Sequence, residues 1–329
     1  MTVASLWSSL SSPPPTALPP LSSVAIDTPQ QIIAATSSPA LATLHKHPFL
    51  YLTWSRCLYL LSHNIDPVYV YEGSTAPILH ANQQTLRPLL AALGVPHINA
   101  PSNAEAVAAG LNERGLVDAV ISSDSDALLY GAKTLVTDFT VENCRASSVT
   151  VFKQSSLHTV GGNEIGRRGL IAYAMLAGSD EAAKGVAAVG ATKALKFLSD
   201  LPPSTDPLAA LRELKTSPHK LASKVAAIAD FPNEQVIAKY LNAHSPAIDA
   251  WDKVVRVARP SLTAVLAVDA ATCLHGFGGA GSRCKLVQAF LEMIVRYVSG
   301  RQTERSEFNL HSLQPVLTLA LLLSRAPER

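Results

Sequence analysis

The chain lacks most of the features that mark secreted, zinc-knuckle or membrane proteins. Only 4 of its 329 residues are cysteines, and they form neither a C-x-x-C pair nor a matching histidine spacing. A zinc knuckle and a disulfide framework are therefore not indicated, and a reducing intracellular compartment is expected. The Ser- and Pro-rich start lacks the basic and apolar segments of a signal peptide. The apolar run Val316–Leu323 is too short to span a bilayer, so no membrane association is expected.

Charge is also sparse, and it is balanced in sign. Charged residues make up 16% of the chain and the formal net charge is +2. The chain is therefore not a polycation, and any contact with nucleic acid must come from local basic patches. No dense Lys/Arg run marks a nuclear import signal. With 48% hydrophobic residues, the chain is long enough for one large or two modest domains with substantial cores.

The most informative feature is a set of acids that directly follow short apolar runs. The runs 23–26, 68–71 and 117–121 each read as a buried strand followed by helical periodicity, which is typical of a parallel sheet with crossover helices. Ligands bind at the carboxyl ends of such strands. Carboxylates gathered there repel one another unless cations neutralise them. The pattern therefore predicts a divalent-metal site of the two-ion type, the chemistry of phosphodiester cleavage, next to Asp27, Glu72, Asp124 and Asp126.

Further elements follow from periodicity and turn signals. The prolines at 202, 203 and 207 indicate a linker or surface excursion over residues 201–218. We therefore predict a nuclease-like core over residues 1–200 and a mainly helical region over residues 201–329. The expected elements are a strand at Val95–Ile98 and helices at Phe49–Ser62, Gln83–Leu93, Ala104–Asn112, Leu221–Ala229, Glu234–Leu241, Ala264–Cys273 and Lys285–Val298. The glycine cluster 276–281 follows no clear strand and is interpreted as a loop.

Two motifs resemble the XPG/flap-endonuclease family. Residues 117–132 read VDAVISSDSDALLYGA, similar to the family's internal nuclease motif of an apolar strand, D-x-D and a helix ending in Y-G. Residues 170–190 read LIAYAMLAGSDEAAKGVAAVG, which resembles the segment L-G-x-D-Y and the helix-hairpin after it. The pair Glu72-Gly73 and the D-x-D motif are most similar to those of the GEN-type Holliday-junction resolvase branch. The resemblance covers roughly residues 6–198, and the sequence is less similar beyond that point.

The resemblance implies a fold, a cofactor and a substrate. The fold is an α/β, PIN-like nuclease core with a parallel sheet and a helix-hairpin. Branched or flapped double-stranded DNA is the implied partner, with a dimer on four-way junctions and a nuclear location. Two Mg²⁺ or Mn²⁺ ions and a monovalent cation at the hairpin are the implied cofactors. The implied metal ligands and catalytic residues are Asp27, Glu72, Glu105, Asp124, Asp126 and Asp180, and the implied DNA contacts are Gly185, Gly190, Lys184, Lys193, Lys196, Arg167 and Arg168.

This chain departs from the family pattern in several places. Asn103-Ala104-Glu105 stands where the family has E-A-E, so one acid has become an amide without charge. Ala188 replaces a preferred glycine, and Glu181 replaces the usual tyrosine. Between Glu72 and Gln84 there is no room for the family's basic helical arch. We therefore expect weaker catalysis and weaker, less salt-sensitive DNA binding.

Five of the six acids also have a local interpretation. Asp27 suits a turn before a helix. Asp124 suits the N-cap of the helix that follows it, and Asp126 suits the positive end of the dipole of that helix. Asp180 fits a loop, and Glu105 stands in capping-box spacing from Ser102. One metal site accounts for all six positions together.

The sequence leaves open the role of one basic pair and the exact function. Arg167-Arg168 is either a solvated face or a phosphate contact. The main rival function is a pseudonuclease that keeps the fold and binds DNA or protein. A weaker rival is a small-molecule phosphatase on a related α/β scaffold.

Overall fold

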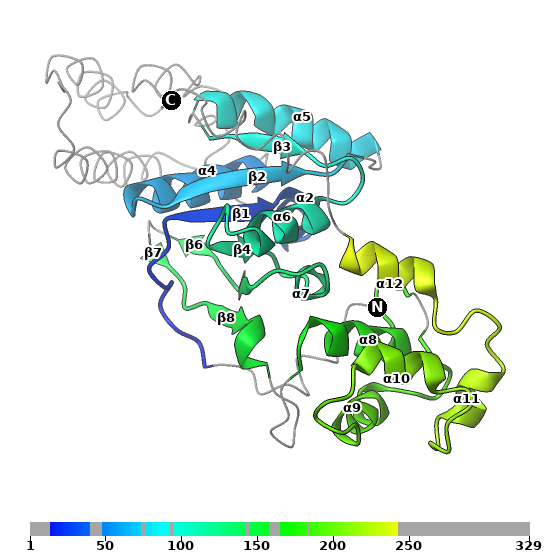
Figure 1. Cartoon of the computed structure of the whole chain (residues 1–329). Helices are drawn as coiled ribbons and strands as arrows, with labels where there is room; N and C mark the ends of the chain where they lie inside the picture. Colours follow the sequence, from blue (N-terminus) through cyan, green and yellow to red (C-terminus); the bar gives the residue numbers. More distant parts are fainter. Residues whose placement is uncertain are drawn as a thin grey trace, which may run out of the picture. The chain divides into compact units, whose positions relative to one another are not determined.

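The computed structural model describes residues 14–39, 48–73, 77–92, 95–142, 145–157, 165–182 and 185–242. The chain is mixed α/β, with a six-stranded, mainly parallel sheet in the order β3-β2-β1-β4-β5-β8 (Figure 1). The predicted fold class is confirmed. Among the described residues, two compact units alternate along the chain: unit 1 comprises residues within 14–16, 105–138 and 148–242, and unit 2 comprises residues within 17–104 and 139–147.

Unit 2 contains the predicted strand–helix alternation. β1 pairs in parallel with β2, and β2 with β3, because helices carry the chain back between the strands. Val24, Ala25 and Val70 are completely buried, as expected for strands covered on both faces. The elements are β1 (Ser23–Asp27), α2 (Thr28–Thr36), α4 (Pro48–Ser62), β2 (Asp66–Tyr71), α5 (Pro77–Ala92), β3 (His97–Asn99), β6 (Val141–Glu142) and β7 (Arg145–Ala146), and α6 (Ala104–Glu113) begins where unit 2 passes into unit 1.

The sheet strands of unit 1 come from the next part of the chain. β4 (Ala119–Ile121) pairs in parallel with β5 (Thr134–Thr137), and β8 (Thr150–Lys153) adds to β5 antiparallel. The single turn α7 (Asp126–Leu129) directly follows β4, and a 3-10 turn, η1 (Gln154–Ser156), follows β8. The acid pair Asp124 and Asp126 therefore lies at the carboxyl end of a buried parallel strand, as the sequence predicts.

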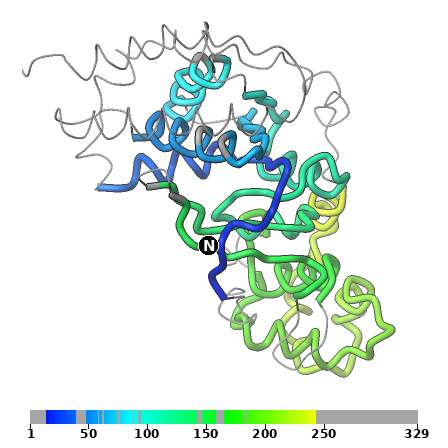
Figure 2. Tube along the Cα trace, turned by 90° about the vertical axis from the view of Figure 1, so that its left-hand side faces the viewer, coloured from blue at the N-terminus to red at the C-terminus, as the bar shows by residue number. Residues whose placement is uncertain are grey.

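A group of helices completes unit 1. Helix α8 packs against α7, α9 and α10, and Figures 1 and 2 show the helices of the group in colours from green to yellow. Residues 169–176 of α8 are all buried, so this helix forms the core of the group. The members are α8 (Arg167–Ala177), α9 (Ala191–Ser199), α10 (Pro207–Glu213), α11 (Ala222–Ala226) and α12 (Glu234–Leu241).

The region beyond residue 200 differs in part from the prediction. The predicted linker over residues 201–218 is wrong in its second half, because Pro207 starts α10 and Asp206 caps it through Leu208 N. The predicted helix Glu234–Leu241 is confirmed as α12, which Asn233 caps through two backbone amides. The division into a core up to residue 200 and a helical region after it stays a prediction.

Several predicted features lie outside the described residues. They are the helices at Ala264–Cys273 and Lys285–Val298, the glycine cluster 276–281 and Lys184. No helix in the described part of the chain has the length and apolar character needed to cross a bilayer.

Candidate active site

The acid pair after β4 is fixed by a tight local turn. The Ser122 hydroxyl accepts a hydrogen bond from the Asp124 amide, and Asp124 Oδ1 accepts one from the Asp126 amide, each at 3.1 Å. Short side chains that bond the backbone two residues on favour such turns. Asp124 is only 5% exposed and Asp126 only 2%. The turn therefore holds two carboxylates side by side, shielded from water.

Burial and mutual repulsion raise the pKa of both carboxyl groups of the pair. Burial raises the pKa of Asp124 above its usual value, and the charge of Asp180 adds to the rise. Burial, followed by the charge of Asp124, raises the pKa of Asp126 to about 7. Asp180 also acts on Asp126. Three of the six predicted ligands therefore interact electrostatically within unit 1, and a nearby cation would relieve their repulsion.

Asp180 and Glu105 reach this part of unit 1 from two further segments. Asp180 is exposed and directly follows Ser179, which is completely buried after α8. Glu105 lies in the first turn of α6 and is 8% exposed. Its charge contributes to the raised pKa of Tyr130, after burial and the nearby Glu181 and Tyr240. Unit 1 thus carries four of the six predicted acids.

Tyr240 is a residue of this site that the sequence did not indicate. It lies on α12, is completely buried, and its hydroxyl is 3.0 Å from Asp126 Oδ2 and 2.8 Å from Ser179 Oγ. Its ring packs on Tyr130, with 4.9 Å between ring centroids. No local signal could have paired Tyr240 with an acid 114 residues earlier. The only available hint was the amphipathic helix itself, whose apolar face includes this tyrosine.

Glu181 also contacts α12, through Lys239, and the neighbouring Tyr130. The Tyr130 hydroxyl donates to Glu181 Oε1 at 3.0 Å, and Lys239 forms an ion pair with the same oxygen at 2.5 Å. Glu181, which stands where the family has a tyrosine, therefore links α12 to the segment that carries Asp180.

Asp27 and Glu72 lie in unit 2, after two neighbouring parallel strands. Asp27 is 3% exposed and occupies the N-cap position of α2, although its side chain makes no capping hydrogen bond. Glu72 Oε2 accepts a hydrogen bond from the Ala104 amide at 3.0 Å. Glu72 therefore binds the first amide of α6, next to the predicted Asn103-Ala104-Glu105 motif.

The glycine after Glu72 is required by close backbone contact. A Cβ atom at Gly73 would lie 2.0 Å from the carbonyl oxygen of Ala100. The Gly73 amide donates to the carbonyl of Ser102 at 3.3 Å. Only glycine allows this approach, which brings Glu72 alongside the start of α6.

The donor set fits a hard cation, although the arrangement is not that of a closed metal cage. Within the described residues, no three His, Cys, Asp or Glu side chains stand together as a metal-binding group. The buried Oδ1 of Asp126 makes no hydrogen bond of ordinary geometry to the described residues. A buried, charged oxygen without a donor is costly. All the candidate ligands are carboxylates, the ligand type that Mg²⁺ and Mn²⁺ prefer.

The predicted hairpin lies between α8 and α9 in unit 1. Gly185 has φ +54°, and a Cβ there would meet Gly178 N at 2.5 Å. Gly190, the N-cap of α9, faces open space. Lys193 Nζ donates to the Ala188 carbonyl at 2.8 Å. Gly185 is therefore needed for packing, whereas Gly190 leaves the start of α9 accessible.

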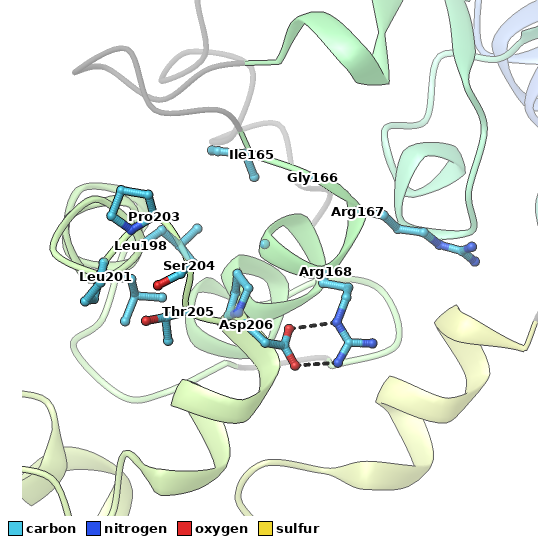
Figure 3. A pocket seen from close by; sticks show the side chains of 13 residues that line it. Ile165, Gly166, Arg167, Arg168, Leu198, Leu201, Pro203, Ser204, Thr205 and Asp206 are labelled. Atoms are coloured by element: carbon cyan, nitrogen blue, oxygen red, sulfur yellow. Dashed lines mark hydrogen bonds and ion pairs between the residues drawn. The ribbon is translucent and has the colours of Figure 1, made fainter.

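The two adjacent arginines have different surroundings. Arg167 donates to the Leu129 and Tyr130 carbonyls and pairs with Glu113 at 2.6 Å, contacts that favour a structural role. Arg168 makes two hydrogen bonds to Asp206 beside a cavity of about 710 Å³ and is 47% exposed (Figure 3). Of the pair, Arg168 is the one that solvent reaches readily.

Comparison with known proteins identifies relatives of this chain. Residues 94–180 match the XPG I-region, which spans Glu105, Asp124, Asp126 and Asp180. The mouse flap endonuclease GEN homolog 1 is 31% identical over 204 residues, which are 53% of this chain and 22% of the relative. The flap endonuclease 1 of Saccharolobus solfataricus is 35% identical over 122 residues, 34% of each protein. The chain thus spans well under half the length of these relatives.

Solved structures share the fold. Human GEN1 in complex with Holliday junction DNA matches with a TM-score of 0.68 at 23% identity, covering 88% of this chain and 75% of that one. The catalytic core of Rad2 in complex with a DNA substrate matches with a TM-score of 0.62 at 20% identity, covering 88% of this chain and 99% of that one. The resemblance seen in the sequence is therefore confirmed: the chain is similar to GEN-type flap endonucleases, and its residues 94–180 match the XPG I-region.

Proposed function

We propose that the protein is a metal-dependent, structure-specific DNA endonuclease that acts on flaps or four-way junctions. The observation that carries this proposal is the buried acid pair Asp124 and Asp126, which interacts with Asp180 inside the XPG I-region. The GEN1 structures solved with product DNA hold Mg²⁺, or Mg²⁺ and Mn²⁺. The same cations suit the carboxylates of this chain.

Each acid has a proposed part in the reaction. Asp124, Asp126, Asp180 and Glu105 would hold the cations, and Asp27 and Glu72 stay predicted ligands on the sequence alone. Two bound Mg²⁺ or Mn²⁺ ions would activate a water and stabilise charge on the phosphate. The protein then contributes position: the turn at Ser122 fixes the acid pair, and its burial strengthens the attraction between these acids and a cation.

The hairpin between α8 and α9 is the proposed duplex contact. Gly190, the N-cap of α9, is exposed and a Cβ there would meet open space, and helix N-termini favour phosphate oxygens. Lys193 and Lys196 are exposed on α9, and Lys184 would add charge. A GEN-1 structure is solved with potassium, and a monovalent cation at residues 185–190 is part of this proposal. Arg168 could add a phosphate contact if it releases Asp206.

Cleavage of branched DNA tests the proposal directly. We expect Mg²⁺- or Mn²⁺-dependent incision of labelled 5′-flap and four-way-junction DNA by the full chain. The matched control is the double variant Asp124→Asn, Asp126→Asn, which keeps the shape of both side chains but removes their charge. Incision that persists in this variant would show a contaminating nuclease. Cleavage of phosphomonoesters without preference for branched DNA would favour a small-molecule phosphatase.

The second candidate is a pseudonuclease that binds DNA or protein without useful turnover. Asn103 favours it, because the E-A-E pattern is reduced to one acid beside the start of α6. Restoring the acid separates the two candidates. Asn103→Glu should raise incision at least tenfold if the amide is a defect in a working site, and Asn103→Gln should not. If neither the natural chain nor Asn103→Glu cuts while both bind junctions, the pseudonuclease is correct.

We also propose a nuclear location and action as a dimer on four-way junctions. Both proposals rest on the relatives, which are flap endonucleases and a junction-bound GEN1. Imaging of the tagged full chain tests the location, and the mass of the chain–junction complex tests the dimer.

A further inference from the structure

The hydroxyl of Tyr240 lies at the centre of a continuous line of hydrogen bonds. Tyr240 Oη is 3.0 Å from Asp126 Oδ2 and 2.8 Å from Ser179 Oγ. Ser179 Oγ in turn accepts a hydrogen bond from the Ala182 amide at 3.0 Å. Asp126, Ser179 and Tyr240 are all at most 2% exposed. The line therefore runs through a part of unit 1 that bulk water does not reach.

The chemistry of the groups fixes the direction of the protons. An ionised Asp126 can only accept hydrogen bonds, so the single proton of the Tyr240 hydroxyl must go to Oδ2. The Ser179 hydroxyl then donates to Tyr240 Oη, while its oxygen accepts from the Ala182 amide. Each donor in such a line polarises the next, which strengthens the final hydrogen bond to the carboxylate.

The line joins the two segments that carry the interacting acids. Asp126 begins α7, and Ser179 immediately precedes Asp180. Tyr240 commits Oδ2 of Asp126 to a hydrogen bond, whereas the buried Oδ1 has no ordinary hydrogen bond to the described residues. The two oxygens of the carboxylate are thus distinguished by their contacts, although the Asp180 amide also acts as a hydrogen-bond donor to this carboxyl group. Oδ1 is the oxygen that Tyr240 leaves for a cation.

We propose that Tyr240 is a positioning residue of the metal site, whose hydroxyl holds Asp126 Oδ2 so that Oδ1 binds the cation. This inference rests on the proposed divalent-metal site. A residue that orients a ligand in this way typically changes metal affinity about 10- to 100-fold when it is removed. Helix α12, which lies beyond the matched I-region, thereby becomes part of the site.

The position of α12 does not depend on this hydroxyl. The ion pair of Lys239 with Glu181 holds the helix from the neighbouring residue. The Tyr240 ring rests on Tyr130, and its carbonyl accepts a hydrogen bond from Arg167. A phenylalanine at 240 would keep the ring contact and the carbonyl contact. The variant Tyr240→Phe therefore removes the hydroxyl and leaves the helix in place.

Binding of Mn²⁺ to the full chain without DNA tests the inference apart from catalysis. We expect Tyr240→Phe to weaken Mn²⁺ binding, measured by calorimetry or by the EPR signal of free Mn²⁺, by about tenfold or more. The matched control is Tyr130→Phe, which removes the hydroxyl of the neighbouring ring but no contact to Asp126; it should stay within about twofold. Raising Mn²⁺ should restore DNA incision by Tyr240→Phe, because the defect is in affinity.

The outcomes separate this inference from the proposed function. If the natural chain binds Mn²⁺ as poorly as the double Asp124→Asn, Asp126→Asn variant, the metal site and the inference both fail. If the natural chain binds Mn²⁺ and Tyr240→Phe binds it equally well, only the role of Tyr240 is overturned. Should Tyr240→Phe not fold, as judged by circular dichroism, Ser179→Ala breaks the same line and must also weaken Mn²⁺ binding.

Discussion

At the scale of single residues, His97 lies beside the side chains of Arg87 and Tyr71 in unit 2. Its Nε2 lies 3.0 Å from Arg87 Nη1, and its ring is 5.1 Å from the ring of Tyr71. Arg87 also donates to Asn99 Oδ1 at 2.6 Å and lies over the Tyr71 ring. A second positive charge on His97 would face this guanidinium, so the folded protein favours the neutral imidazole.

The stability of the protein should therefore fall as His97 becomes protonated. Burial, and then the charge of Arg87, lower the pKa of His97 below its ordinary value of 6.5. The folded state thus binds this proton less tightly than the unfolded chain does. The contribution to stability is present above about pH 6.5 and is lost as the pH falls through the folded pKa.

Urea unfolding between about pH 5 and pH 7.5 measures this effect. His97→Phe keeps a ring beside Tyr71 but cannot titrate, so its free energy of unfolding should fall less on acidification than that of the natural chain. Equal slopes for His97→Phe and the natural chain would contradict the prediction.

At the scale of elements, Arg167 fastens three helices of unit 1 at once. It pairs with Glu113 of α6 and donates to the Leu129 and Tyr130 carbonyls at the end of α7 and the Tyr240 carbonyl of α12. Removing it would leave several carbonyls and a half-buried carboxylate without their donor. The adjacent Arg168 forms an exposed ion pair with Asp206.

The adjacent arginines therefore offer a matched pair of variants. We expect Arg167→Ala to lower the free energy of unfolding by about 2–4 kcal/mol, because a partly buried charge and carbonyls lose their partners. Arg168→Ala should cost about 1 kcal/mol or less. Chemical unfolding of the two variants measures the difference, and similar losses would contradict the structural role of Arg167.

The hairpin between α8 and α9 offers a second matched pair. A Cβ at Gly185 would lie within 2.5 to 2.7 Å of three backbone atoms, and φ there is +54°. We expect Gly185→Ala to destabilise the protein by about 2 kcal/mol or more. Gly190→Ala, with open space and φ −99°, should cost about 1 kcal/mol or less. Thermal unfolding distinguishes the two, and equal costs would refute the close approach.

The elements show which parts of the structure were predictable. β1, β2, α4 and α12 follow from local patterns of apolar residues, and their predicted bounds agree with the structure to within a few residues. Helix α10 was missed because Pro202, Pro203 and Pro207 suggest a linker, whereas only Pro207 takes a helical position. Local signals fix the type of an element but do not decide between a proline that breaks a helix and one that begins it.

The candidate site was predictable only where its residues belong to local motifs. Asp124, Asp126 and Asp180 were predicted because strand ends and the resemblance mark them, and the structure shows that the three interact electrostatically. Tyr240 and the contacts of Glu181 were not predicted, because they join segments 51 to 114 residues apart. Contacts over such separations are set by packing, which leaves no pattern in the spacing of the sequence.

At the scale of the whole molecule, a net charge of +2 limits how strongly salt should affect DNA binding. The proposed duplex contacts include four basic side chains: Lys184, Lys193, Lys196 and Arg168. Neutralising about four phosphates predicts a slope of roughly −4 for the logarithm of the binding constant against the logarithm of salt concentration.

Fluorescence anisotropy with junction DNA, in Ca²⁺ to prevent cleavage, measures this slope. Lys193→Gln should reduce its magnitude by about 1. The control is Lys215→Gln, because Lys215 also donates to a backbone carbonyl, that of Ala229, but lies outside the hairpin; it should leave the slope unchanged. A steep slope that neither variant alters would place the DNA contacts elsewhere on the chain.

The hydrogen bond between Tyr240 and Asp126 closes a loop of 114 residues, and this separation has a consequence during protein synthesis. Ribosomes add about 5–20 residues per second, so Tyr240 is joined to the nascent chain roughly 6–23 s after Asp126. During that time the acids of the nuclease motif exist without the hydroxyl that orients them. A nascent chain interrupted before α12 would therefore carry the acids Asp124 and Asp126 but lack one part of the proposed metal site.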